Sequence, residues 1–175
     1  MKKQIACLLV CSALVSPALA AWLKDISIEG TRRIENATVM DYLNLEKGQN
    51  ITDADLDAAT KTLFSKGLFS DVDIQMKKGV VYIKVKENPI VHTVYFEGNK
   101  ALSDDILKTE VLLKSRMVYT QRKVQSDAAR LVEVYKRNGR FDATVTPKVI
   151  DKDQNRVDIV FEIDEGHKTL VKKIN

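Results

Sequence analysis

One run of oxygen-bearing side chains near the end of the chain has the spacing of a calcium loop. Asp151, Asp153 and Asn155 recur at alternate positions, and Glu162 stands twelfth, where such a loop places its bidentate ligand. Arg156, however, stands sixth, where the tight turn of a calcium loop requires glycine. The residues that follow alternate as a strand does. We therefore interpret the run as a polar hairpin turn, and we expect no metal site and no cofactor.

Other chemistry-bearing residues are equally sparse. His92 and His167 are the only histidines, and neither has a second imidazole near it in sequence. No nucleophile-elbow or paired-carboxylate spacing stands out, and the plentiful serines and aspartates are typical of caps and turns. Both cysteines, Cys7 and Cys11, lie within the first 20 residues, so the remainder has no thiol for catalysis or metal binding. The sequence predicts a protein that is not an enzyme, with an exported hydrolase as a distant alternative.

Residues 1–20 have the pattern of a cleaved signal peptide. Two lysines precede an apolar stretch over residues 5–15, and Ala18-Leu19-Ala20 gives the small-x-small cleavage pattern. That stretch is shorter than the roughly 20 residues of a membrane span. We expect export with cleavage after Ala20. The net charge of +4 includes no clustered basic stripe, which argues against a nucleic-acid partner.

The rest of the chain repeats one pattern. The recurring pairs are residues 26–30 and 94–98, Gly67-Leu68-Phe69 and Gly139-Arg140-Phe141, and residues 85–87 and 163–165. Residues 170–175 resemble residues 90–95, which is the opening of a third copy. Offsets of about 70 residues indicate a modular array.

Each copy reads strand, helix, helix, strand, strand. In the first copy, residues 23–29 alternate as a half-buried strand, and residues 34–45 have helical spacing with a stop at Gly48. Thr52-x-x-Asp55 resembles a capping box for the second helix, which Gly67 ends as a left-handed C-cap. The other predicted features are a hairpin turn at residues 77–79, a strand break at Gly98, helices over residues 103–113 and 121–137, a C-cap at Gly139, and hairpin strands over residues 141–149 and 156–163.

The order of elements predicts an α+β fold in tandem. Each unit has a three-stranded mixed sheet covered on one face by two helices, because the first strand must cross over both helices to reach the hairpin. Asn88-Pro89 forms a short, stiff joint between the units. The tyrosines and phenylalanines are interpreted as packing residues, and Trp22 is expected to pack on the edge of the first unit.

Three groups of residues resemble POTRA domains. They are the Phe96-Glu97-Gly98-Asn99 turn, Gly67-Leu68-Phe69 after a helix, and the Val-Lys-Glu-Asn-Pro run that closes the first copy at Pro89. The chain is most similar in this order to the first two POTRA domains of outer-membrane-protein assembly factors of Gram-negative bacteria. The resemblance implies a signal peptide at 1–20, POTRA units at 22–89 and 90–168, and a truncated start of a third unit at 169–175. Gly30, Gly67, Gly98, Gly139 and Pro89 are the expected structural positions.

The resemblance also implies a function. POTRA arrays of this family lie in the periplasm ahead of an outer-membrane barrel, receive unfolded outer-membrane proteins from periplasmic chaperones, and dock accessory lipoproteins. This chain ends inside a predicted strand, so we interpret it as a piece of a longer protein. The alternative is the POTRA region of a two-partner secretion transporter, which recognises one dedicated substrate. The start of the first strand directly after the signal favours the assembly factor.

In this family the second strand of each unit lies at a sheet edge, where unpaired N–H and C=O groups can bind an incoming extended segment. The candidate docking residues are Ser70, Asp71, Val72, Asp73, Ile74, Gln75 and Met76 in the first unit, and Asp142, Ala143, Thr144, Val145 and Thr146 in the second. Pro147 cannot donate to a ladder. We therefore expect the first edge to bind strands better than the second, the alternative being that both edges are merely solvated.

Overall fold

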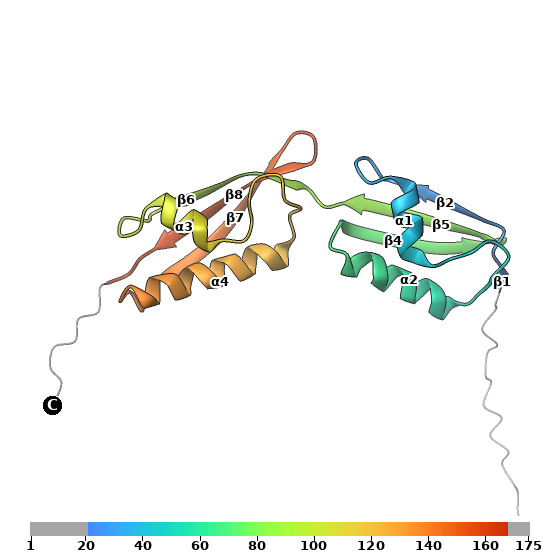
Figure 1. The fold of residues 1–175 in the computed structure, drawn as a ribbon, viewed down its shortest axis with the longest axis horizontal. Helices are drawn as coiled ribbons and strands as arrows, with labels where there is room; N and C mark the ends of the chain where they lie inside the picture. The colour runs from blue at the N-terminus through green and yellow to red at the C-terminus, as the bar shows by residue number, and fades with distance from the viewer. Residues whose placement is uncertain (1–20, 168–175) are drawn as a thin grey trace, which may run out of the picture.

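The computed structural model describes residues 21–167 as two successive units (Figure 1). The predicted signal peptide at 1–20 and the predicted start of a third unit at 169–175 lie outside the described residues. The predicted boundary at residue 168 lies outside them as well.

The first unit contains a three-stranded sheet and a small two-stranded one. Its elements are β1 (Ala21–Trp22), β2 (Asp25–Glu29), α1 (Asn36–Leu43), β3 (Asn50–Ile51), α2 (Asp53–Ser65), β4 (Phe69–Lys77) and β5 (Val80–Glu87). The strand order is β2-β5-β4, with β2 parallel and β4 antiparallel to the central β5. This mixed sheet, with the helices on one side, confirms the predicted fold class (Figure 1).

The second unit repeats the architecture. Its elements are β6 (Ile90–Glu97), α3 (Asp104–Glu110), α4 (Gln121–Arg137), β7 (Thr144–Lys152) and β8 (Arg156–Asp164). The strand order is β6-β8-β7, again with one parallel and one antiparallel pair. The bounds of α4 agree with the predicted helix, because its apolar stripe of Val124, Ala128, Leu131 and Tyr135 is buried over the whole length.

Each unit has its own hydrophobic core. In the first, α2 packs against β4 and α1 packs against α2. Val81, Ile83 and Val85 of β5 face these helices and are buried, while Tyr82 and Lys84 point to the opposite, open face of the sheet. In the second unit, Phe96 and Phe161 stack with ring centroids 5.8 Å apart inside an equivalent core.

The first helices show where local signals succeed and fail. The predicted capping box is present, since the Thr52 side chain accepts from the Asp55 N–H and the Asp55 carboxylate accepts from the Thr52 N–H. Helix α1 ends before the predicted stop at Gly48. Asn44 is already left-handed there, with φ of 49°, a conformation that asparagine tolerates better than most residues.

The start of the first unit differs from prediction in two ways. The expected strand over residues 23–29 begins at Asp25, because Leu23 turns into the core and donates its N–H to the Gln49 carbonyl at 2.8 Å. The expectation that Trp22 packs on the unit's edge is wrong for its side chain, which is 68% exposed. Only its main chain joins the edge, in register with Asn50 of β3.

Candidate functional site

Strand β4 forms an open edge of the first sheet. It pairs with β5 on one side, and within residues 21–167 no strand pairs with its other side. All seven candidate docking residues of this unit, from Ser70 to Met76, lie in β4. A register shift between Phe69 and Asp71 marks an irregularity at the start of the strand, and Ser70 Oγ donates to the Lys86 carbonyl there at 3.2 Å.

The two faces of β4 differ in chemistry. Val72, Ile74 and Met76 face the helices and pack in or against the core. Asp71 and Asp73 lie on the open face. A groove of about 650 Å³ is lined there by Gly30, Arg32, Asp71, Asp73, Lys84, Val85, Lys86, Glu87 and Asn155. An extended segment added to this edge would therefore place alternate side chains beside a surface of mixed charge, on which Asp71 and Asp73 lie next to Lys86 and Lys84.

Strand β7 forms the corresponding edge of the second sheet. Thr144, Val145 and Thr146 lie in this strand, but the prediction is wrong for Asp142 and Ala143. Those two residues belong to the turn after α4, where the Ala143 N–H donates to the Arg140 carbonyl at 3.4 Å. The strand begins later than predicted and extends instead to Lys152.

Pro147 lies in the middle of this second edge. It stands in register with Phe161 of β8, just as Ile74 stands in register with Ile83 of β5. The repeated sequence motif aligns Ile83 with Phe161, so Pro147 occupies the position that Ile74 holds in the first unit. Proline has no N–H and is therefore confined to sheet positions where no ladder hydrogen bond is donated. On an edge strand, such a position has its backbone nitrogen facing solvent. The equivalent N–H of Ile74 should then face outward as well.

A buried glutamate at the end of β5 fixes the loop that follows β2. Glu87 is 3% exposed, and its Oε1 accepts from the backbone N–H groups of Arg32, Arg33 and Ile34 at 2.7, 2.8 and 3.0 Å. Its Oε2 accepts from Arg33 Nε at 2.9 Å. Burial alone would raise the pKa of Glu87, but these hydrogen bonds outweigh it and lower the pKa below the usual range.

The second unit repeats this device with other partners. Glu165, which is also buried, accepts from the Ala101 N–H at 2.6 Å and lies 3.4 Å from Arg140 Nη2. The loop after the first strand is thus tied to the end of the last strand in both units. The glutamate that ends the Val-Lys-Glu and Ile-Asp-Glu motifs therefore has the same structural role in each unit, as a hydrogen-bond acceptor for that loop.

A further buried carboxylate was not among the predicted site residues. Asp127 of α4 is fully buried, and its two oxygens accept from the N–H groups of Leu112 and Leu113 at 3.0 and 2.8 Å. The sequence does mark Asp127 as unusual, because it is a charged residue on an apolar helical stripe, three residues after Val124 and four before Leu131. This contact shapes the loop between α3 and α4.

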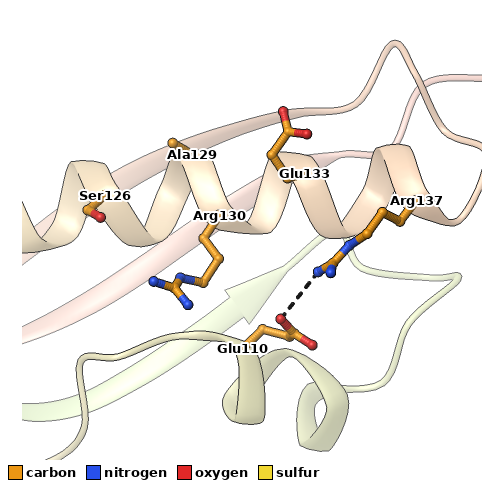
Figure 2. A pocket seen from close by; sticks show the side chains of 6 residues that line it. All are labelled: Glu110, Ser126, Ala129, Arg130, Glu133 and Arg137. Carbon is orange, nitrogen blue, oxygen red and sulfur yellow. Dashed lines mark hydrogen bonds and ion pairs between the residues drawn. The ribbon is translucent and has the colours of Figure 1, made fainter.

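Figure 2 shows a groove between α3 and α4, about 600 Å³ in volume. It is lined by Glu110, Ser126, Ala129, Arg130, Glu133 and Arg137. Arg137 Nη2 reaches across to Glu110 Oε2 at 3.5 Å. No residue predicted to bind strands lies in this groove, and its charged walls belong to an exposed surface.

The calcium-like run forms a hairpin turn, as predicted. Residues 153–155 connect β7 to β8, and within this tight three-residue turn Gln154 and Asn155 have positive φ, of 62° and 53°. Glu162 pairs with Lys148 instead of facing the turn. His92 contacts Asp158 through Nδ1 at 2.9 Å. Among residues 21–167, no three or more His, Cys, Asp or Glu side chains are grouped to hold a metal ion.

A family model supports this arrangement of two similar units. The model of the POTRA family, described as a surface antigen variable number repeat, matches residues 23–88 and again residues 89–166. The chain belongs to the POTRA family. The two matched POTRA segments meet at Asn88, within the joint between β5 and β6.

Curated relatives of this POTRA chain are outer-membrane-protein assembly factors named BamA. The chain is 32% identical over 176 residues to the factor of Neisseria meningitidis serogroup B, which covers 98% of this chain and 22% of the relative. It is 27% identical over 150 residues to that of Neorickettsia risticii, covering 86% and 20%. The chain thus spans about a fifth of the length of these relatives.

Solved POTRA structures share the fold. The N-terminal domain of Omp85 from Thermosynechococcus elongatus matches with a TM-score of 0.64 and 18% identity, covering 84% of this chain and 63% of that one. POTRA domains 1 and 2 of the periplasmic domain of Omp85 from Anabaena match with a TM-score of 0.57 and 16% identity, covering 86% and 98%. In the part of the chain described, no helix is both long and apolar enough to cross a membrane.

Proposed function

We propose that this chain is the periplasmic POTRA region of an outer-membrane-protein assembly factor. In this role it is a non-enzymatic scaffold that receives unfolded outer-membrane β-barrel proteins from periplasmic chaperones and docks accessory lipoproteins. Its parent protein would lie in the outer membrane of a Gram-negative bacterium. Membership of the POTRA family and the similarity to BamA proteins support this proposal.

The observation that carries the proposal is the open edge of β4. Nine consecutive residues, Phe69–Lys77, present one row of main-chain groups to solvent. At about 3.4 Å per residue the edge is roughly 30 Å long, enough to pair with a whole strand of an unfolded barrel protein. Main-chain pairing is nearly independent of side-chain identity, so one edge could serve many substrates.

Strand addition at β4 would not require the sheet to rearrange. Its core-facing residues Val72 and Ile74 are already packed beneath α2, and it pairs with β5 without interruption from Asp71 to Lys77. Only the outward N–H and C=O groups change partner, from water to the incoming chain. The gain per hydrogen bond is small, about 1 kcal/mol, which suits transient capture and release.

Titration of the ¹⁵N-labelled chain with a peptide from an outer-membrane barrel strand tests the proposal. We expect the largest amide shifts along residues 70–76, with smaller shifts along residues 144–149. Larger shifts on β7 than on β4 would contradict the order of the two edges, and shifts confined to the helices would contradict strand addition altogether.

The alternative is the POTRA region of a two-partner secretion transporter. Such a region recognises one dedicated substrate, whereas the proposed scaffold binds many. Peptides from several unrelated barrel proteins should therefore shift the same β4 amides. Binding of a single sequence with no response to the others would favour the transporter.

A further inference from the structure

The chain passes from the first unit to the second through two residues, Asn88 and Pro89, and both are held by hydrogen bonds. β5, the central strand of the first sheet, leads directly into β6, the first strand of the second (Figure 1). The Asn88 N–H donates to the Leu68 carbonyl at 2.8 Å, and its side-chain Nδ2 donates to the Gly67 carbonyl at 3.0 Å. The first unit therefore fixes the near end of the joint.

The second unit reaches back to the same main chain. The Asn155 Nδ2 donates to the carbonyl oxygen of Glu87 at 3.0 Å and lies 3.5 Å from that of Asn88. The Asn155 carbonyl accepts from the Ile90 N–H at 3.0 Å. One residue at the tip of the β7–β8 hairpin thus bonds to the chain on both sides of Pro89.

A residue of the first unit completes the arrangement. Arg33 Nη2 donates to the Asn88 carbonyl at 2.6 Å, and Arg33 is itself held by the buried Glu87 carboxylate. The Asn88 carbonyl consequently lies between an arginine of the first unit and an asparagine of the second. The Tyr119 N–H of the second unit also donates to the Pro89 carbonyl, at 2.9 Å.

We propose that the Asn155 carboxamide is a clamp that fixes the orientation of the two units by binding the main chain leaving the first one. Its position depends on the tight turn, in which Asn155 has φ of 53°. The run whose spacing resembles a calcium loop, which includes Asn155, thus supplies a contact between the two units in the fold. The inference rests on the joint alone and stands independently of the proposed function.

The turn offers a substitution that removes the carboxamide and little else. Asn155→Gly keeps the positive φ and the main-chain bond to Ile90, and deletes only the donor to the joint. Gln154→Gly is the matched control, because Gln154 lies in the same turn at φ of 62° and its side chain bonds to no other described residue. Asn155→Asp is a second variant that turns a carboxylate toward two carbonyl oxygens.

Distances between spin labels measure the effect. Labels on cysteines placed at the exposed positions Lys61 of α2 and Gln125 of α4 report on the two units, with Cys7 and Cys11 replaced by serine so that no other thiol is present. We expect a narrow distance distribution for the parent chain and for Gln154→Gly. Asn155→Gly should broaden it, with the ratio of undocked to docked molecules rising roughly fivefold or more.

The outcome can overturn the inference in either of two ways. A distribution as narrow in Asn155→Gly as in the parent would show that the carboxamide does not hold the units, and equal broadening in Gln154→Gly would assign the effect to the turn backbone. Circular dichroism confirms that each variant is folded. If Asn155→Gly loses its sheet signal, Asn155→Asp decides, and a narrow distribution in that variant overturns the proposal.

Discussion

Gly30 lies against the main chain of Val85 so closely that a Cβ at position 30 would be 1.9 Å from the Val85 carbonyl oxygen. The second unit reproduces the contact, with a Cβ on Gly98 falling 2.1 Å from the Ile163 carbonyl. Both glycines have positive φ, and they follow β2 and β6, the first strands of the two three-stranded sheets. The glycine of each repeated Glu-Gly motif therefore contacts the first residue of the motif that ends the same unit, Val-Lys-Glu in the first and Ile-Asp-Glu in the second.

Gly30→Ala should destabilise the first unit strongly. The positive φ costs roughly 1–3 kcal/mol, and displacing the Val85 carbonyl should add about as much again. Gly48→Ala isolates the first cost, because Gly48 has φ of 85° with nothing within 4 Å of the added methyl group. Urea unfolding of both variants gives the comparison, and equal losses would show that the carbonyl contact is unimportant.

Glu87→Gln should lower the free energy of unfolding at neutral pH and make that free energy depend less on pH in the acid range. The lowered pKa of Glu87 means that its contribution is complete above the ordinary value of 4.5 and is lost as the pH falls through the folded-state value. We expect a loss of about 2–3 kcal/mol near neutrality, shrinking toward acid pH. Chemical unfolding across this range measures it. Glu35→Gln, at an exposed site nearby, serves as control, and a parallel shift of both variants would contradict the assignment.

Exchanging the residue types at positions 74 and 147 should weaken the binding of an extended peptide to β4 and strengthen its binding to β7. Ile74→Pro removes an outward N–H from β4, and Pro147→Ile restores one on β7. Loss of one strand hydrogen bond should weaken binding of a barrel-strand peptide to β4 about fivefold, with a gain at β7 in the reverse variant. Ile74→Ala controls for lost packing. Peptide titration followed by amide shifts would reject strand addition if Ile74→Ala and Ile74→Pro bound equally.

Asp127→Ala should destabilise the second unit by about 2–4 kcal/mol. Removing the carboxylate leaves the N–H groups of Leu112 and Leu113 without their partner. Glu133→Ala, on the exposed side of the same helix, should change stability by no more than about 0.5 kcal/mol. Thermal unfolding distinguishes them, and a small effect of Asp127→Ala would mean that water replaces the carboxylate.

Local pattern was sufficient for most elements of the fold. The apolar stripe of residues 121–137 predicted α4 with its observed bounds, and Thr52-x-x-Asp55 predicted the cap of α2. These signals succeed because the interacting residues lie within one helical turn of each other. The order of the elements then followed from the repeat.

Contacts between distant residues were not predictable in the same way. Glu87 meets Arg32, Arg33 and Ile34 more than 50 residues earlier in the chain, so no local period reveals the contact. The pairing of β1 with β3 was missed because each contributes only two residues. Asn155 was predicted to lie in a turn, but its bond to the joint depends on the placement of two whole units.

The pairing of β2 with β5 has a consequence for the order in which the chain is made. β2 has its ladder partner in β5, the last strand of the unit, so the three-stranded sheet stays incomplete until residues up to Glu87 have been synthesised. The hydrogen bond from Asn155 to the joint can form only later, because Asn155 is synthesised nearly 70 residues after Glu87. A newly made first unit therefore finishes its own core well before its orientation is set, and the last hairpin of the second unit completes the joint.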